Sequence, residues 1–130
     1  MVGKPTDRQL REYLGTLELE IMQAVWAMGP STVNDVLDRL NRRKGRDLVY
    51  NTVMSTMARL HDKGYLDRHR EGKAYVYEGS GPTNFLRDRV AETVRDAYDE
   101  HGDLALAGFR EGLDEDARAD LRRLLSEDAD

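Results

Sequence analysis

Apolar residues recur every three or four positions early in the chain, which is the spacing of one face of an α-helix. The first such stripe consists of Leu17, Ile21, Val25 and Met28. Met22 and Trp26 lie off this stripe, and Gly29 and Pro30 end the helix that it predicts.

The pattern predicts two further short helices. Thr32 followed by Asp35 indicates a capping box at the start of the second helix. The apolar face of that helix consists of Val33, Val36, Leu37 and Leu40. The third helix begins near Val49 and stops at Gly64, a residue suited to the left-handed conformation beyond a helix end. Its inward residues are Val53, Met57 and Leu60.

The next segment, residues 65–78 (YLDRHREGKAYVYE), predicts a β-hairpin whose turn centres on Glu71 and Gly72. In this register the opposed pairs are Leu66 with Tyr77, Arg68 with Tyr75 and Arg70 with Lys73. The predicted hairpin therefore has an apolar base and a cationic tip.

The segment GSGPT, from Gly79 to Thr83, has the small, polar, proline-containing composition of a linker. It divides the chain into two predicted domains, residues 1–79 and 80–130. The roughly fifty residues that follow carry apolar stripes with helical spacing. They are too few to enclose a core alone, so we expect this part to form a dimer. The predicted dimer interface consists of Phe85, Leu86, Val90, Val94, Leu113, Leu121, Leu124 and Leu125.

The charge is divided unevenly along the 130 residues, although the net value is -5. Residues 1–79 carry 13 Lys and Arg against 11 Asp and Glu, whereas residues 80–130 carry 7 against 14. Between Arg39 and Lys73 there are ten basic and four acidic residues, net +6. The first domain therefore has positive charge with which to bind phosphates, which the overall composition conceals.

Three helices followed by a hairpin describe a winged helix-turn-helix, whose third helix enters the DNA major groove while the hairpin contacts the backbone. At about 100° per residue, four polar side chains of the third helix share one sector, opposite its inward residues. These candidate base contacts are Asn51, Thr52, Ser55 and Arg59. The alternative, a merely solvated polar face, becomes the weaker interpretation once the hairpin is taken into account.

Two groups of cations accompany this helix. The loop before it carries Arg42, Arg43, Lys44 and Arg46. The hairpin tip carries Arg68, Arg70 and Lys73. We expect both groups to contact DNA phosphates. The alternatives are a solvated loop and a strand edge kept soluble by its charges.

The sequence offers no basis for catalysis or for metal binding. It has no cysteine, and His61, His69 and His101 do not form the close pair that a metal site shows. No phosphate-binding glycine loop or nucleophile elbow is present. We therefore predict no enzyme activity, no cofactor and no metal. The absence of a leader or an apolar span predicts a cytoplasmic protein that does not enter a membrane.

Two stretches, LELEIMQAVWAMGPSTVNDVLDRL and LVYNTVMSTMARLHDKGYLDRHREGKAYVY, resemble the penicillinase-repressor (BlaI/MecI/CopY) family of bacterial regulators. The resemblance extends from Leu17 to Leu125. It implies a homodimeric repressor with an N-terminal winged helix and a C-terminal helical dimerisation region, bound to an inverted repeat in a promoter. By matching, the family's recognition-helix contacts fall on Asn51, Thr52, Ser55 and Arg59.

Two features of that family are missing from the chain. Its copper-responsive branch senses metal through cysteine pairs, which are absent here. In its antibiotic-responsive branch, a membrane sensor's signal leads to cleavage at an Asn-Phe pair in the dimerisation region. The matching pair here is Gly108 and Phe109, so glycine stands where that branch has asparagine. The candidate cleavage site at this pair, and an inducing protease, are implied by the resemblance alone.

We therefore expect a mainly α protein with a winged-helix DNA-binding domain and a helical dimerisation domain. Its predicted partners are double-stranded operator DNA and a second copy of the chain, and its predicted role is a repressor that occupies a promoter. The alternatives are a ligand-sensing winged-helix regulator and a winged-helix protein-interaction module that does not read DNA.

Overall fold

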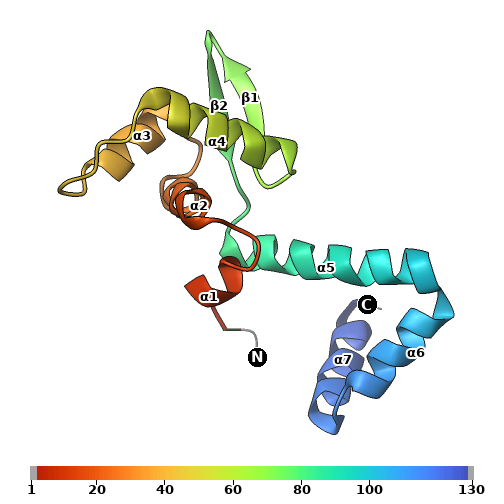
Figure 1. Cartoon of the computed structure of the whole chain (residues 1–130). Helices are drawn as coiled ribbons and strands as arrows, with labels where there is room; N and C mark the ends of the chain where they lie inside the picture. Colours follow the sequence, from red (N-terminus) through yellow and green to blue (C-terminus); the bar gives the residue numbers. More distant parts are fainter. Residues whose placement is uncertain (1–2, 129–130) are drawn as a thin grey trace. The chain divides into compact units, whose positions relative to one another are not determined.

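The structure is a computed structural model that describes residues 3–128, most of them helical (Figure 1). The elements in chain order are α1 (Asp7–Leu10), α2 (Thr16–Met28), α3 (Val33–Asn41), α4 (Tyr50–Asp62), β1 (Asp67–Glu71), β2 (Ala74–Glu78), α5 (Pro82–His101), α6 (Asp103–Gly112) and α7 (Glu115–Asp128). The chain divides into two compact units, the first ending at Asp88 and the second beginning at Arg89. Helix α5 begins in the first unit and ends in the second.

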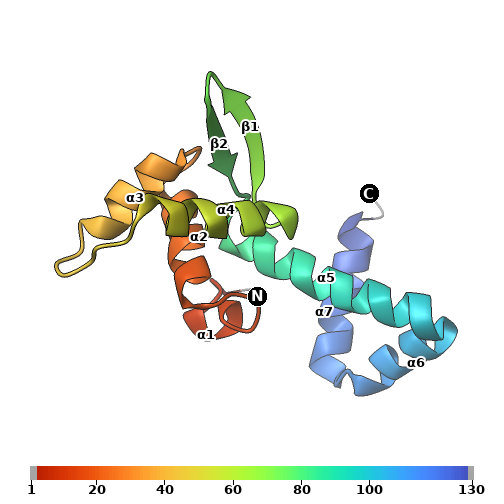
Figure 2. The ribbon, with the colours of Figure 1, turned by 45° about the horizontal axis from the view of Figure 1, so that its top comes forward.

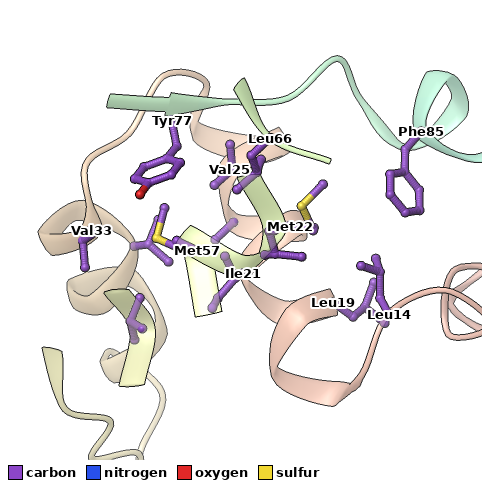
Figure 3. Close-up of a cluster of buried hydrophobic side chains, with 14 of the residues drawn as sticks. Leu14, Leu19, Ile21, Met22, Val25, Val33, Met57, Leu66, Tyr77 and Phe85 are labelled. Atoms are coloured by element: carbon purple, nitrogen blue, oxygen red, sulfur yellow. The ribbon is translucent and has the colours of Figure 1, made fainter. Parts of the chain in front are cut away.

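Helix α2 lies at the centre of the first unit, in contact with α3, α4 and β2. The prediction that Met22 and Trp26 lie off its core stripe is therefore wrong. Met22 is fully buried beside Ile21 and Val25 (Figure 3). Trp26 is partly buried and packs against the same core. A single stripe describes a helix with one buried face, whereas α2 is covered on several sides.

Helix α1 is an element that the sequence pattern did not predict. Thr6 and Gln9 form its capping box, with bonds of 2.9 and 3.2 Å between backbone N–H groups and side-chain oxygens. The segment buries Leu10 and, just beyond the helix, Leu14. A helix of four residues is too short to show a period of 3.6.

Helices α3 and α4 have the predicted capping and buried faces. The Thr32 side chain accepts a bond from the Asp35 N–H at 3.1 Å, and Asp35 accepts one from the Thr32 N–H at 2.9 Å. On α4, Val53, Met57 and Leu60 are all 0% exposed. The side chains predicted to face inward on the two helices thus lie in or against the common core of the first unit.

Helix α4 ends at the predicted glycine. Gly64 has a φ of 81°, in the left-handed region. The Tyr65 N–H donates to the Leu60 carbonyl at 2.9 Å and the Gly64 N–H to the His61 carbonyl at 2.9 Å. These two bonds form a Schellman motif, which satisfies the last carbonyls of α4 and reverses the chain into the hairpin.

The hairpin is present, but its predicted register is wrong by two residues. The observed opposed pairs include Arg68 with Tyr77 and Arg70 with Tyr75. The turn consists of Gly72 and Lys73, because the φ of 63° at Gly72 suits the first central position of a type II′ turn. A shift of two residues keeps the same side chains on each face of the ribbon.

The base of the hairpin is fixed to the helical core. Ser31 and Tyr77 exchange two backbone hydrogen bonds, of 2.9 and 2.8 Å. Tyr77 and Leu66 are buried, and Figure 3 shows Tyr77 on the side of the cluster where Met57 of α4 lies. Figures 1 and 2 show the tip projecting from the helices on the side of α4. The hairpin therefore keeps a defined position beside that helix.

Phe85 lies in the core of the first unit, and not in an apolar face left for a dimer partner as predicted. It is 4% exposed. Its ring centroid lies 4.9 Å from that of Tyr65, 5.7 Å from that of Trp26 and 6.3 Å from that of Tyr13. The first turn of α5 thus completes the core of the first unit. The boundary between the two units accordingly lies after Asp88, and not after Gly79 as predicted.

The second unit consists of the rest of α5 with α6 and α7. Within the described residues, its large apolar side chains are all at least partly exposed. Val90 is 51% exposed, Phe109 46% and Leu125 60%. The unit therefore leaves extensive apolar surface in contact with water.

Replacing Phe85 by alanine should lower the free energy of unfolding of the first unit by about 3 kcal/mol or more, since a large buried side chain is lost. Urea denaturation followed by the fluorescence of Trp26, the chain's single tryptophan, measures this. Phe109→Ala, at the other phenylalanine, is the matched control and should leave that transition nearly unchanged. Equal shifts in both variants would contradict the placement of Phe85.

Candidate nucleic-acid interface

The outer face of α4 presents the four predicted base-contacting residues to solvent. Asn51, Thr52, Ser55 and Arg59 are all exposed, opposite the buried face. The Arg59 Nη2 donates to the Thr56 hydroxyl at 3.3 Å, and that hydroxyl donates to the Thr52 carbonyl at 2.8 Å. These bonds hold the guanidinium along the helix and leave its other N–H groups available to a partner.

The cationic loop between α3 and α4 is closed by bonds that the sequence analysis did not anticipate. The Asn41 amide donates to the Leu48 carbonyl at 2.9 Å and accepts from the Leu48 N–H at 2.9 Å. Arg46 forms an ion pair of 2.8 Å with Glu20 of α2. Four cations of this loop were predicted to contact phosphates. Arg46 is engaged in holding the loop, and the three that remain exposed are Arg42, Arg43 and Lys44.

The hairpin cations are arranged by tyrosines. The Arg68 guanidinium carbon lies 4.1 Å from the centroid of the Tyr75 ring, and that of Arg70 lies 5.1 Å from it. Arg68 also donates to the Tyr77 hydroxyl at 3.3 Å. Stacking on an aromatic face restricts the two arginines to one side of the ribbon. Lys73 lies in the turn at the tip.

The C-terminal end of α4 is tied to the start of α2 by Glu18. Its carboxylate accepts from the Gly15 N–H at 2.9 Å and from the Lys63 ammonium at 2.9 Å. Partial burial raises the pKa of Glu18, but the bonds from Gly15 and Lys63, with the nearby charge of Arg59, outweigh it and lower the pKa below its usual value. One carboxylate thus fixes α4 relative to α2.

Glu18 and Asn41 position the surface and were not predicted to do so. Tyr75 was predicted opposite Arg68, but its contact with Arg70 was not. Asn41 and Tyr75 lie beside the cations to which the charge pattern directed attention, and Glu18 lies beside the apolar stripe of the first predicted helix. Glu18 stands three residues after a helix-starting glycine, which is the capping-box spacing and a signal that was available. The other two act through contacts that depend on the loop closure and the hairpin register.

Apart from Leu86, which is half-buried in the first unit, the remaining predicted positions lie in the second unit. Gly108 and Phe109 are inside α6, both exposed. Among residues 3–128, no group of three or more His, Cys, Asp or Glu side chains is placed to hold a metal ion. Within the same range, no helix is long and apolar enough to cross a membrane.

Helices α2 to α4 with the hairpin define a winged helix-turn-helix, the class whose third helix and wing form one nucleic-acid-binding surface. The family model described as penicillinase repressor matches residues 14–127, and the chain belongs to this family. The resemblance described from the sequence is thereby confirmed.

Individual relatives agree with this assignment. The transcriptional regulator BlaI of Mycobacterium tuberculosis is 34% identical over 120 residues, which span 88% of this chain and 83% of that protein. The methicillin resistance regulatory protein MecI of Staphylococcus aureus is 21% identical over 116 residues, 87% of this chain and 93% of its own length. Among solved structures, the complex of hsRosR-S1 aligns with 91% of this chain and 94% of its own at a TM-score of 0.51 and 13% identity, a likeness of fold alone.

Glu18→Gln should keep the bond to Gly15 but lose the ion pair with Lys63. Because the pKa of Glu18 is lowered in the folded chain, its ionised form stabilises the fold above the unfolded-state pKa of about 4.3. The variant should therefore be less stable by about 1 kcal/mol near pH 6, and the difference should vanish as the pH falls through the folded pKa. Urea denaturation at a series of pH values measures this. The exposed Glu12→Gln is the control, and a pH-independent difference would contradict the ion pair.

Replacing Arg70 and Lys73 together by glutamine should weaken binding to any DNA duplex. If both contact phosphates, the slope of log affinity against log salt should flatten by about 2 units. The double variant Arg8→Gln with Arg11→Gln removes the same charge outside the interface and should leave the slope nearly unchanged. Fluorescence anisotropy at several salt concentrations measures the slopes, and a wing variant with the parent slope would show that neither residue meets a phosphate.

Proposed function

We propose that this protein is a transcriptional repressor that binds a double-stranded operator as a homodimer and blocks a promoter by occupying it. The observation that carries the proposal is the outer face of α4 with the hairpin beside it, since Tyr50 and Met54 of α4 line one groove with Lys73 and Tyr75. On that outer face, four exposed polar residues of α4 lie next to a wing whose arginines are held on one face. Membership of the penicillinase-repressor family supports the same function.

In this proposal α4 lies in the major groove. Its donors and acceptors, Asn51, Thr52, Ser55 and Arg59, contact base edges, and the planar guanidinium of Arg59 suits a guanine. The cations that bind the flanking phosphates are Arg42, Arg43, Lys44, Arg68, Arg70 and Lys73. Arg46, paired with Glu20, positions the loop that presents the first three.

Dimerisation through the second unit follows from its exposed apolar residues. Val90, Val94, Leu121, Leu124 and Leu125 cannot be covered within a single unit of three short helices, and a second copy provides the missing surface. Two first units joined in this way bind the two half-sites of an inverted repeat. Once one of them is bound, the other meets its half-site at a high effective concentration.

Induction by a protease would require local unfolding of α6. The peptide bond between Gly108 and Phe109 lies inside α6, so it must leave the helix before a protease can bind it in an extended form. Glycine within a helix costs about 1 kcal/mol relative to alanine, which favours unwinding there. Cutting this bond would separate α7 from the rest of the dimerisation surface.

The proposal places the protein in the cytoplasm, where its operator lies, and gives it no catalytic role and no cofactor. A protein-interaction module with the same fold would bind DNA without discrimination between sequences. A repressor should instead prefer its operator to random DNA by about 10³ or more. A footprint on the DNA upstream of its own gene is the direct way to identify such an operator.

Arg59→Ala should weaken binding to that operator by about 1 to 3 kcal/mol and affect random DNA much less, since a base contact carries sequence information. Arg39→Ala, which removes an exposed arginine from α3, is the control for charge alone. Anisotropy titrations of both duplexes give the comparison. Equal losses on operator and random DNA would assign Arg59 to phosphate contact only.

A further inference from the structure

The exposed face of α4 has an apolar edge that its polar pattern conceals. Tyr50 and Met54, one helical turn apart, are 43% and 38% exposed, and Val49 just before the helix is 60% exposed. The core does not use these side chains, because Val53 and Met57 fill it from the opposite face. Clustered apolar side chains that remain in water commonly mark a binding surface.

This edge adjoins the wing. At about 100° per residue, Met54 lies about 60° from Asn51, on the side away from Thr52 and Arg59. Tyr50 and Met54 line a groove together with Asn34 of α3 and with Lys73 and Tyr75 of the hairpin. The groove thus joins the apolar edge of α4 to a cation of the wing.

The chemistry around the edge identifies its partner. An apolar protein partner would have to cover Asn51 and Ser55 as well, leaving their polar groups without bonds. DNA can bind the polar residues and the apolar edge together. Its base edges bond with Asn51 and Ser55, and the 5-methyl group of thymine supplies an apolar contact in the same major groove. The positive charges of Lys73 and of the loop before α4 match its phosphates.

We propose that Met54 is a specificity-determining residue whose thioether packs on the 5-methyl group of a thymine in each operator half-site. Met54 is flexible enough to follow the methyl group, and Tyr50 covers the other side of the contact. This inference rests on the proposed function and adds to it a prediction about the operator, namely a thymine next to the base contacted by Asn51 or Ser55.

The test uses the full chain and a duplex that it selects from a random library. Each thymine of that duplex is replaced in turn by deoxyuridine, which keeps base pairing and removes only the methyl group. One thymine per half-site should prove sensitive, with about fourfold weaker binding when one is changed and about fifteenfold when both are, the factor expected for burying a methyl group. Thymines elsewhere should be replaceable without loss.

The same series with Met54→Ala completes the test. This variant should bind the parent duplex more weakly than the native chain, and it should bind the thymine and deoxyuridine duplexes equally well. Met54→Leu, which keeps an apolar contact, should retain part of the discrimination. Because Met54 is exposed, its variants should unfold at the urea concentration of the native chain, which excludes loss of folding as the cause.

The outcomes separate this inference from the proposed function. Sequence-specific binding in which every thymine can be replaced without loss would overturn the role of Met54 and leave the repressor intact. Methyl sensitivity that persists in Met54→Ala would assign the contact to another residue. If no duplex is enriched from the library, both the inference and the proposed function fail.

Discussion

The rotational setting of α4 about its own axis is the constraint on which the interface depends. Val53, Met57 and Leu60 are completely buried against α2 and its neighbours, and this packing decides which side chains face outward. A rotation of one residue would turn Asn51 and Ser55 out of the sector and expose apolar groups instead. The ion pair between Glu18 and Lys63 fixes the end of the same helix, and the Ser31–Tyr77 bonds fix the wing beside it.

Most elements of the first unit could be predicted because their signals are local. The capping box of Thr32, the stripe of α4 and the glycine after it each depend on residues within one or two helical turns. The outward sector of α4 follows from its inward stripe, so the exposure of the four polar residues could be predicted as well. The family resemblance pointed to the same residues by an independent route.

The errors in burial arose where contacts over long sequence separations decide the structure, whereas the error in the hairpin arose at a local turn. Met22 is buried because α2 is covered on several sides, and Phe85 because the first turn of α5 reaches Tyr13, Trp26 and Tyr65. The hairpin register depended on which two residues form the turn. The pairing of Arg70 with Tyr75 follows from the observed register, whereas the predicted register had already placed Arg68 beside Tyr75.

The central claim is that the outer face of α4 and the adjoining wing form the DNA-reading surface. NMR spectra of the isotopically labelled full chain, titrated with its operator duplex, test this directly. We predict that the largest changes fall on the amide and side-chain signals of residues 50–59 and 68–75, with random DNA affecting mainly the second group. Changes confined to residues 104–125, or an α4 whose signals do not respond to the operator, would contradict it.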